Sequence, residues 1–332
     1  MGKIAINGLG RIGRAALKII LDTPGLTVVA INDLAPLENL AYLLRYDTVY
    51  GRYERPVESG PERLVVSGQS IKVLQQKDPA KLPWRELQID LVLECTGRFT
   101  KREDLEKHVQ AGARSAILSA PSGSEEVVTR VFGVSQTSTP SPVMSCASCT
   151  TNCITPVAEI MDRRIGVKKA TMTTVHAYTA NQGIVDSPSK KPRRGRAGAA
   201  NLVPTSTGAA IATSKVLPQY RGKFDGLAVR VPVPVGSLID LVFVTARSTS
   251  VEEVNRIFKE EATSERYHGV LGVTEDPIVS ADIIQDARAS IVDLSMTQVV
   301  DGDLVKVLSW YDNEWGYAAQ MVREAARLVK SL

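Results

Sequence analysis

The feature that most constrains how this chain can fold is a glycine pattern close to the amino terminus. A short apolar segment, residues 4–7, runs directly into the sequence Gly8-Leu9-Gly10-Arg11-Ile12-Gly13. Helical spacing of apolar residues follows over residues 14–21, and a second apolar segment, residues 26–32, ends at Asp33. A strand, a G-x-G-x-x-G turn, a helix, a second strand and an acid about twenty residues further on predict the βαβ unit that binds dinucleotides.

Each residue of this pattern has a physical role in binding a dinucleotide. Gly8 permits the tight turn, Gly10 lets the backbone approach a pyrophosphate, and Gly13 lets the helix pack closely on the strand. The amino terminus of the helix supplies N–H groups and a positive dipole to the phosphates. Asp33 is expected to accept hydrogen bonds from the ribose hydroxyls of an adenosine.

Strands and helices continue to alternate after this unit. Near-continuous apolar runs predict buried strands of a parallel sheet at residues 89–95 and 115–119, and a polar helix is predicted at residues 102–111. Open α/β sheets bind ligands at the carboxyl ends of their strands. Four residues at these ends are therefore candidate cofactor neighbours: Thr96, Gly97, Ser119 and Ala120. Spacing alone leaves plain strand-ending turns equally open.

The pattern changes after the middle of the chain. Strands are predicted at residues 170–176, 227–233, 238–244, 290–294 and 304–310, which favours a mostly antiparallel sheet. An amphipathic helix ends the chain, and the sheet of the first domain is a surface that it could cover. We therefore expect an α/β protein with two domains. We expect residues 1–148 and 313–332 to form a Rossmann-type dinucleotide-binding domain, and residues 149–312 to form an α+β catalytic domain with the mostly antiparallel sheet.

Composition excludes several classes of function. The net charge of +4 is small for 332 residues and does not by itself indicate a nucleic-acid or membrane partner. No stretch approaches the roughly 20 apolar residues of a membrane-spanning helix, and the first apolar run is too short for a signal peptide. Four cysteines, three of them within eight residues, do not make a disulfide framework, so a cytoplasmic location is expected.

Three interpretations compete for the cluster of Cys146, Cys149 and Cys153. A metal site would need a fourth cysteine or a nearby histidine at ligand spacing, so no metal is expected. Cys146 and Cys149 form a C-x-x-C pair, but outside a thioredoxin-like βαβ unit. A nucleophilic Cys149 is favoured, because residues 150–160 begin polar and turn amphipathic, as a helix start does. A helix amino terminus favours the thiolate.

Three histidines are available as a partner for this thiol. His108 lies in a charged helix and is expected at the surface, and His268 lies in a polar, loop-like stretch. His176 ends a predicted strand and is the best-placed general base. A histidine at the end of a strand is more often structural, which leaves this assignment open on spacing alone.

Six segments in chain order resemble the phosphorylating glyceraldehyde-3-phosphate dehydrogenase family. They are Gly8-Leu9-Gly10-Arg11-Ile12-Gly13-Arg14, Ser148-Cys149-Thr150-Thr151-Asn152-Cys153, His176-Ala177-Tyr178-Thr179, Ser206-Thr207-Gly208-Ala209-Ala210, Arg230-Val231-Pro232 and Trp310-Tyr311-Asp312-Asn313-Glu314-Trp315-Gly316-Tyr317. The resemblance extends over the whole chain, and the second segment is its most specific part. The chain departs from the family at Cys146, where asparagine is more frequent, and over residues 233–236.

The resemblance implies a reaction. The Cys149 thiolate attacks glyceraldehyde 3-phosphate and forms a hemithioacetal, and His176 takes the hydroxyl proton as a hydride leaves for NAD. By the same resemblance, inorganic phosphate then cleaves the thioester and gives 1,3-bisphosphoglycerate. Further residues are implied as phosphate ligands: Thr179 and Arg230 for the substrate, and Ser148, Thr207 and Gly208, with Thr150 nearby, for the attacking phosphate.

The resemblance also implies cofactor contacts and an assembly. Arg11 and Ile12 offer backbone N–H groups to the pyrophosphate, Asn313 fixes the nicotinamide carboxamide, and Tyr317 lies beside the ring. Residues 178–201 resemble the family's S-loop, which lines a subunit interface, so a homotetramer is expected. Five cations within residues 190–196 could also belong to a nucleic-acid patch, although the small net charge gives this little support. An erythrose-4-phosphate dehydrogenase is the alternative enzyme.

Cofactor choice depends on Asp33. A 2′-phosphate would meet a like charge there, so NAD is expected over NADP. Relatives that use NADP despite this acid do so with a hydroxyl residue after it and a serine in the S-loop. Here Leu34 and Pro188 hold those places, and neither can donate a hydrogen bond from its side chain to a phosphate. Ser187 and the nearby cations leave a route to NADP, so use of both cofactors stays open.

Overall fold

The computed structural model describes residues 1–135 and 141–332, which divide into two compact units. The first unit comprises Met1–Arg130, residues 141–147 and Met321–Leu332; the second comprises residues 131–135 and Ser148–Gln320. The domains predicted from the sequence differ from these units at Ser148 and in two short segments. Residues 131–135 belong to the second unit, where the Gly133 carbonyl accepts a hydrogen bond from Arg266. Residues 313–320 belong there too.

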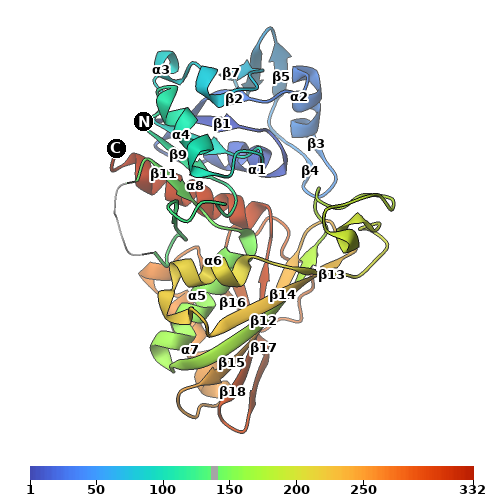
Figure 1. Ribbon diagram of the computed structural model, residues 1–332, viewed down its shortest axis with the longest axis vertical. Coiled ribbons are helices and arrows are strands. Elements are labelled where there is room, and N and C mark those ends of the chain that lie inside the picture. The colour runs from blue at the N-terminus through green and yellow to red at the C-terminus, as the bar shows by residue number, and fades with distance from the viewer. Residues whose placement is uncertain (136–140) are drawn as a thin grey trace. The chain divides into compact units, whose positions relative to one another are not determined.

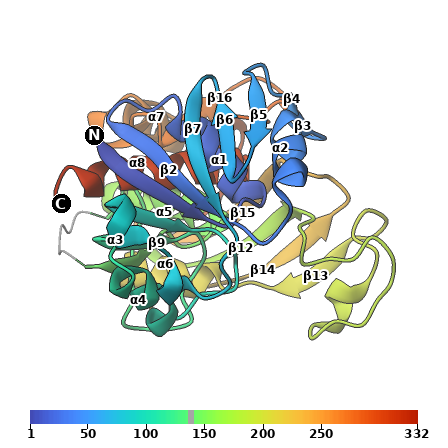
Figure 2. The ribbon, with the colours of Figure 1, turned by 90° about the horizontal axis from the view of Figure 1, so that it is seen from above.

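A doubly wound sheet organises the first unit. Among its described residues nine strands follow the order β10-β11-β9-β8-β1-β2-β7-β6-β5, and Figure 2 shows β2, β7 and β6 side by side. The strands are β1 (Gly2–Asn7), β2 (Leu26–Asn32), β5 (Val57–Gly60), β6 (Arg63–Val66), β7 (Gln69–Leu74), β8 (Leu91–Glu94), β9 (Ser115–Leu118), β10 (Val128–Thr129) and β11 (Val143–Ser145), with a separate pair, β3 (Tyr46–Asp47) and β4 (Gly51–Arg52). From β10 to β7 every neighbouring pair is parallel, which confirms the predicted Rossmann-type fold.

The helices described in this unit ahead of the terminal one are α1 (Arg11–Ile20), α2 (Leu37–Arg45), α3 (Trp84–Leu87) and α4 (Arg102–Gln110), with a 3₁₀ turn at Pro79–Lys81. Helix α1 begins three residues before the predicted start, because Gly10 is its N-cap and the last glycine of the motif already lies in the first turn. A Cβ on Gly13 would stand 2.1 Å from the Gly8 carbonyl oxygen. The glycine therefore permits the close approach of α1 to the turn.

A mostly antiparallel sheet organises the second unit, as predicted. Its described strands follow the order β13-β14-β12-β15-β18-β17-β16, and the β12–β14 and β16–β17 pairs are parallel. They are β12 (Val167–Ala177), β13 (Val203–Ser206), β14 (Phe224–Val231), β15 (Ser237–Thr245), β16 (Leu271–Thr274), β17 (Ser290–Val300) and β18 (Leu304–Tyr311). Helices α5 (Cys149–Arg164), α6 (Ala209–Val216) and α7 (Val251–Ala262) pack on them (Figure 1), and 3₁₀ turns lie at Pro192–Gly195, Pro218–Tyr220 and Glu265–Tyr267.

The chain ends in the amphipathic helix α8 (Trp315–Val329), whose stripe of Met321, Ala325 and Leu328 is buried. In the first unit this helix meets β1, since a Cβ on Gly2 would stand 2.2 Å from Cγ1 of Val329. The terminal helix therefore contacts the sheet of the first domain, as the sequence suggested. No helix within the described residues has both the length and the apolar character of a membrane span.

Candidate active site

The predicted cofactor residues of the first unit gather at one edge of its sheet. Strands β9, β8, β1 and β2 are neighbours and run parallel, so their carboxyl ends lie in a row. The residues that follow these ends are those singled out from the sequence: Ser119 and Ala120 after β9, Thr96 and Gly97 after β8, the glycine turn after β1, and Asp33 after β2. Ligands of open α/β sheets bind at such an edge.

The glycine turn leaves room for a ligand at the start of α1. Gly8 has φ +95°, and a Cβ on it would stand 2.7 Å from the backbone nitrogen of Thr96. A Cβ on Gly10 would meet nothing within 4 Å, so the space beside this residue is open. Arg11 and Ile12 begin α1, whose first turn has no acidic residue and no side-chain cap. The helix terminus is thus suited to an anion.

Asp33 is held in a fixed orientation beside this turn. Its Oδ2 accepts a hydrogen bond from the backbone of Leu9 at 2.7 Å, and its Oδ1 accepts one from the backbone of Ala35 at 2.9 Å. The carboxylate is half-buried, and each oxygen has a second lone pair that a ribose hydroxyl can use.

The proposed nucleophile stands at the start of a helix, as predicted. Ser148 is the N-cap of α5 and accepts a hydrogen bond from the backbone of Thr151 at 3.1 Å, so Cys149 is the first helical residue. The Thr150 hydroxyl lies 4.0 Å from the thiol sulfur. Cys149 is half-buried, whereas Cys153, one turn further on, is fully buried.

His176 faces this thiol from β12. Its Nε2 lies 3.4 Å from the Cys149 Sγ, a hydrogen-bond distance for sulfur. The other ring nitrogen, Nδ1, lies 2.7 Å from the Ala177 carbonyl and 2.7 Å from Nη1 of Arg230. Arg230 is the register partner of His176 on the parallel strand β14, which places the guanidinium beside the ring. The two residues predicted to carry the chemistry are therefore in contact.

Burial sets the resting charges of this pair. It raises the pKa of the Cys149 thiol above its ordinary value, while Arg230 and the hydrogen bonds of Thr150 act in the opposite direction. Burial, followed by the charge of Arg230, lowers the pKa of His176 to about 3. The ring is thus neutral near pH 7, the form that a general base needs. At Cys149 burial outweighs the helix terminus, which was expected to favour the thiolate.

Two supporting residues were missed in the sequence. The Tyr311 hydroxyl lies 2.9 Å from both the Thr150 and the Thr174 hydroxyl, and its ring meets that of His176 edge-on with 6.0 Å between centroids. Arg194 donates to the Thr205 hydroxyl and the Ser206 carbonyl, and its charge lowers the pKa of His176. The motif around residue 310 pointed to Tyr311, whereas the run of cations did not single out Arg194.

The predicted phosphate ligands lie around the same elements of the second unit. Among the described atoms, the Thr179 hydroxyl is buried and has no hydrogen-bond partner. Gly208 is the N-cap of α6, and the Thr207 hydroxyl before it accepts a hydrogen bond from the backbone of Ala209 at 3.2 Å. Together with Arg230 of β14, these residues offer hydroxyls, a helix terminus and positive charge, which are suitable donors for oxyanions.

Asn313 and Tyr317 belong to the second unit, unlike the other predicted cofactor residues. The Asn313 amide oxygen accepts hydrogen bonds from the Gly236 backbone at 3.2 Å and the Ser237 hydroxyl at 2.9 Å. Its amide nitrogen is therefore the part suited to a ligand carbonyl. Tyr317 is buried in the first turn of α8.

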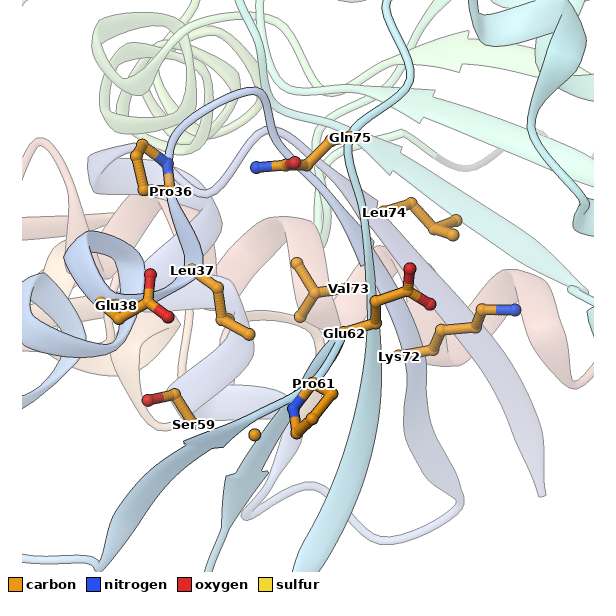
Figure 3. Close-up of a pocket in the computed structure, with 11 residues that line it drawn as sticks. Pro36, Leu37, Glu38, Ser59, Pro61, Glu62, Lys72, Val73, Leu74 and Gln75 are labelled. Carbon is orange, nitrogen blue, oxygen red and sulfur yellow. The ribbon is translucent and has the colours of Figure 1, made fainter.

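Neither a disulfide nor a metal centre occurs among the described residues. The four cysteines are thiols and not disulfides, and within the described residues no three His, Cys, Asp or Glu side chains converge as a metal site would require. A cavity of about 730 Å³ lies between α2, the β5–β6 turn and β7, lined among others by Leu37, Pro61 and Val73 (Figure 3). Its lining includes none of the predicted site residues, so it is not the candidate site.

Comparison with known proteins gives two family matches. Residues 2–102 match the model for the NAD binding domain of glyceraldehyde 3-phosphate dehydrogenase, and residues 148–313 match the model for its C-terminal domain. The chain is 48% identical over 330 residues to glyceraldehyde-3-phosphate dehydrogenase of Clostridium pasteurianum, which covers 97% of each chain. It is 47% identical over 324 residues to glyceraldehyde-3-phosphate dehydrogenase 2 of Streptomyces avermitilis, with 96% of each chain covered.

Proposed function

The chain belongs to the glyceraldehyde-3-phosphate dehydrogenase family, and we propose that Cys149 and His176 carry its reaction. That reaction is the NAD-dependent oxidation of glyceraldehyde 3-phosphate with uptake of inorganic phosphate. The observation that supports these two residues is the 3.4 Å contact between a half-buried thiol and a neutral imidazole.

The contact allows a balanced sequence of steps. Sγ of Cys149 attacks the aldehyde carbon, and Nε2 of His176 receives the thiol proton and passes it to the carbonyl oxygen, giving a hemithioacetal. His176 then removes the hydroxyl proton as the C–H bond breaks with its electron pair, which leaves a thioester on Cys149. NAD, when bound, accepts that electron pair as a hydride. An oxygen of inorganic phosphate displaces Sγ from the thioester carbon and gives 1,3-bisphosphoglycerate; Sγ leaves as a thiolate and takes back the proton held by His176, which restores the starting pair.

Arg230 links substrate binding to the form of the base. A guanidinium can only donate, so its contact with Nδ1 favours a ring that carries its proton on Nε2. The Ala177 carbonyl favours the opposite tautomer, with Nδ1–H and a bare Nε2 that faces the thiol. A substrate phosphate that draws Arg230 toward itself leaves the carbonyl as the partner of Nδ1, and so favours the tautomer that can act as a base.

Two groups of donors support two phosphate sites. Thr179, with its unpartnered hydroxyl, and Arg230 are assigned to the substrate phosphate. Ser148, Thr150, Thr207 and Gly208 are assigned to the attacking phosphate, at the amino termini of α5 and α6. Arg194 adds a further positive charge near the base.

The residues of the first unit fit NAD. Gly10 leaves open space where a pyrophosphate would approach, and Arg11 and Ile12 begin the helix that would face it. The anchored Asp33 carboxylate suits the two hydroxyls of an unphosphorylated ribose. The further contacts assigned to the cofactor are those of Gly8, Gly13, Thr96, Gly97, Ser119, Ala120, Asn313 and Tyr317.

A homotetramer is part of the proposal. Segment 178–201 and its neighbour Leu202 carry large apolar side chains that are mostly exposed, with Ile184 at 89%, Val185 at 72% and Leu202 at 69%. Burial of such side chains against another copy of the chain would be favourable. Sedimentation of the purified protein tests this assembly. The cytoplasmic location also remains a prediction, which fractionation of the source cells tests.

One assay tests the function. The protein is incubated with NAD and glyceraldehyde 3-phosphate, and NADH formation is followed with and without inorganic phosphate. We expect sustained turnover only with phosphate; without it, turnover should stop near one equivalent per active site, because the thioester accumulates. Erythrose 4-phosphate in the same assay identifies the alternative enzyme if it is the better substrate.

A further inference from the structure

A row of buried polar side chains crosses the sheet of the first unit beneath the proposed cofactor edge. Asn32, Asn7 and Glu94 end the neighbouring strands β2, β1 and β8 at the same register. The Asn32 amide donates to the Asn7 oxygen at 2.7 Å, and the Asn7 amide donates to Oε2 of Glu94 at 2.5 Å. All three are buried, and Glu94 is 0% exposed. We refer to these three residues as the polar row.

The row continues into helix α4 through His108. This residue was expected at the surface, but it is fully buried, because the inner face of α4 meets Trp84 and Glu94. Trp84 donates its indole N–H to Nδ1 of His108 at 3.1 Å, and Nε2 of His108 lies 3.0 Å from Oε2 of Glu94. An indole nitrogen can only donate, so His108 accepts at Nδ1 and donates from Nε2 to the carboxylate.

Donor-only groups fix the direction of every bond in the row. At the other end the backbone N–H of Gln76 donates to Oδ1 of Asn32 at 2.8 Å, while Nδ2 of Asn32 donates to the Gln76 carbonyl at 2.9 Å. The orientation of the Asn32 amide therefore cannot be reversed, and the orientation of Asn7 follows from it. Both chains of donors converge on Glu94, which must accept from each.

Glu94 connects the polar row to Thr96, at the edge of the sheet where the cofactor is proposed to bind. Its second oxygen, Oε1, accepts hydrogen bonds from the backbone N–H of Thr96 at 2.8 Å and from the Thr96 hydroxyl at 2.5 Å. Four donors thus surround a buried carboxylate, and none of them is a lysine or arginine. The backbone of Thr96 lies against Gly8, and the Gly8 N–H donates to the Asn32 carbonyl at 2.7 Å.

We propose that Glu94 is a positioning residue of the dinucleotide site, which through the polar row holds the Thr96 loop in register with the glycine turn and the Asp33 loop. The proposal rests on the assignment of these loops to NAD. The Thr96 loop, the glycine turn and the Asp33 loop each follow one of the three strands that the polar row joins. A fourth loop, at Gln76, is hydrogen-bonded to Asn32. A shift of the Thr96 loop would change its distance from the glycine turn, and so the shape of the dinucleotide site, while the hydrogen bonds of the sheet stay intact.

Glu94→Gln is the direct test, since it keeps the shape and removes one acceptor. His108 and Asn7 are fixed as donors toward Oε2, so the new amide group must turn toward Thr96, where it opposes a backbone N–H. We expect the NAD dissociation constant, measured by titration calorimetry, to rise about tenfold or more, as for an unsatisfied buried donor. The KM for NAD should rise with it, while kcat at saturating NAD should stay within about threefold.

Two further measurements separate positioning from general damage. Amide hydrogen exchange should accelerate in residues 94–99 of the Glu94→Gln protein, and not across the other strands of the sheet. Glu324→Gln is the matched control, because Glu324 is also buried in this unit, where it accepts hydrogen bonds from Arg327 at 2.6 and 3.0 Å. This control should lower the melting temperature and leave NAD affinity unchanged.

The outcomes are distinct. Wild-type protein that does not bind NAD would contradict the proposed function itself. If the wild type binds NAD and Glu94→Gln binds it equally well, only the positioning role is overturned. The same holds if Glu324→Gln loses as much NAD affinity as Glu94→Gln. If Glu94→Gln does not fold, Glu94→Asp replaces it. The shorter side chain keeps the charge but withdraws the carboxylate from Thr96. Unchanged NAD affinity in Glu94→Asp would also refute the proposal.

Discussion

At Cys149, burial opposes ionisation of the thiol, and the nearby positive charge of Arg230 favours it. The neutral imidazole of His176 at 3.4 Å gives the proton a destination, so the thiol need not be ionised at rest. Reactivity at this residue therefore depends on the pair, and not on the thiol alone.

Cys149→Ser should abolish dehydrogenase activity and leave the fold and NAD binding largely intact, because a hydroxyl is a far weaker nucleophile at this position. Turnover and NAD titration of the same preparation provide the measurement. Cys146→Ser is the control and should remain active. Retained activity in Cys149→Ser, or its loss only in Cys146→Ser, would place the nucleophile elsewhere.

His176→Asn should lower kcat by ~10²–10⁴-fold, the usual effect of losing a general base. The variant thiol should also react more slowly with iodoacetamide near neutral pH, since Nε2 no longer receives the thiol proton. Stopped-flow alkylation of both proteins measures this difference. Equal alkylation rates would show that the ring does not assist Cys149.

Asp33 should make NAD the preferred cofactor by at least about tenfold in kcat/KM, or roughly 1.4 kcal/mol. Its anchored carboxylate would repel a 2′-phosphate, and Leu34 beside it offers no side-chain donor. Rates with NAD and NADP at saturating substrate and phosphate decide the matter. Equal efficiencies would mean that Ser187 and the cations of residues 190–196 outweigh this acid.

What the sequence predicts about single residues depends on how local the signal is. Cys149 and Asp33 follow from motifs whose spacing is set by one turn or one strand, so their surroundings could be anticipated. His108 could not be placed correctly, because its burial depends on Trp84 and Glu94, which lie 24 and 14 residues away. Tyr311 at the end of β18 joins Thr150 of helix α5 and Thr174 of strand β12, and no local pattern carries that contact.

At the scale of elements, replacing Gly10 or Gly13 of the glycine turn by alanine should have different effects on stability and on NAD binding. Gly10→Ala should leave the melting temperature almost unchanged, because a Cβ there meets no atom, but it should weaken NAD binding by occupying the open space. Gly13→Ala should lower the melting temperature, since its Cβ would overlap the Gly8 carbonyl. Thermal melts and NAD titrations of both variants check the contrast. If the two variants showed the same change in melting temperature and the same change in NAD affinity, the contrast would be wrong.

Strands and helices with a clear pattern of apolar residues could be predicted from the sequence, but the residues at which they begin and end were predicted less accurately. The second strand was predicted over its observed range, Leu26–Asn32, because apolar residues fill it and the acid ends it. The strand predicted at residues 89–95 is shorter, Leu91–Glu94; at its start the backbone N–H of Ile89 donates to the carbonyl of Trp84 in the preceding helical turn, and not to a neighbouring strand. The strand predicted at residues 290–294 continues to Val300; over residues 295–300 most side chains are exposed, and polar and apolar residues are mixed, so the run of apolar residues that marks the first part is lost.

At the scale of the whole molecule, His176 links the stability of the fold to pH. Its pKa is about 3 in the folded chain and 6.5 when unperturbed, so between these values the unfolded chain binds a proton that the folded chain does not. Stability from this group is complete above pH 6.5 and is lost as the pH falls toward 3. The drop in melting temperature from about pH 7 to about pH 4 should therefore be smaller in His176→Asn than in the wild type. Equal drops would show that the ring is not buried in its neutral form.

The unequal surroundings of the four thiols have a practical consequence for anyone who wishes to attach a probe. Burial raises the pKa of Cys95 and Cys153 to about 12 and that of Cys146 well above its ordinary value. The Cys149 thiol, in contrast, lies 3.4 Å from the imidazole of His176, which can receive its proton. A limiting amount of a fluorescent alkylating reagent should therefore label one position per chain without any cysteine being removed by mutation. Protection of that label site by substrate would then report occupancy of the active site directly.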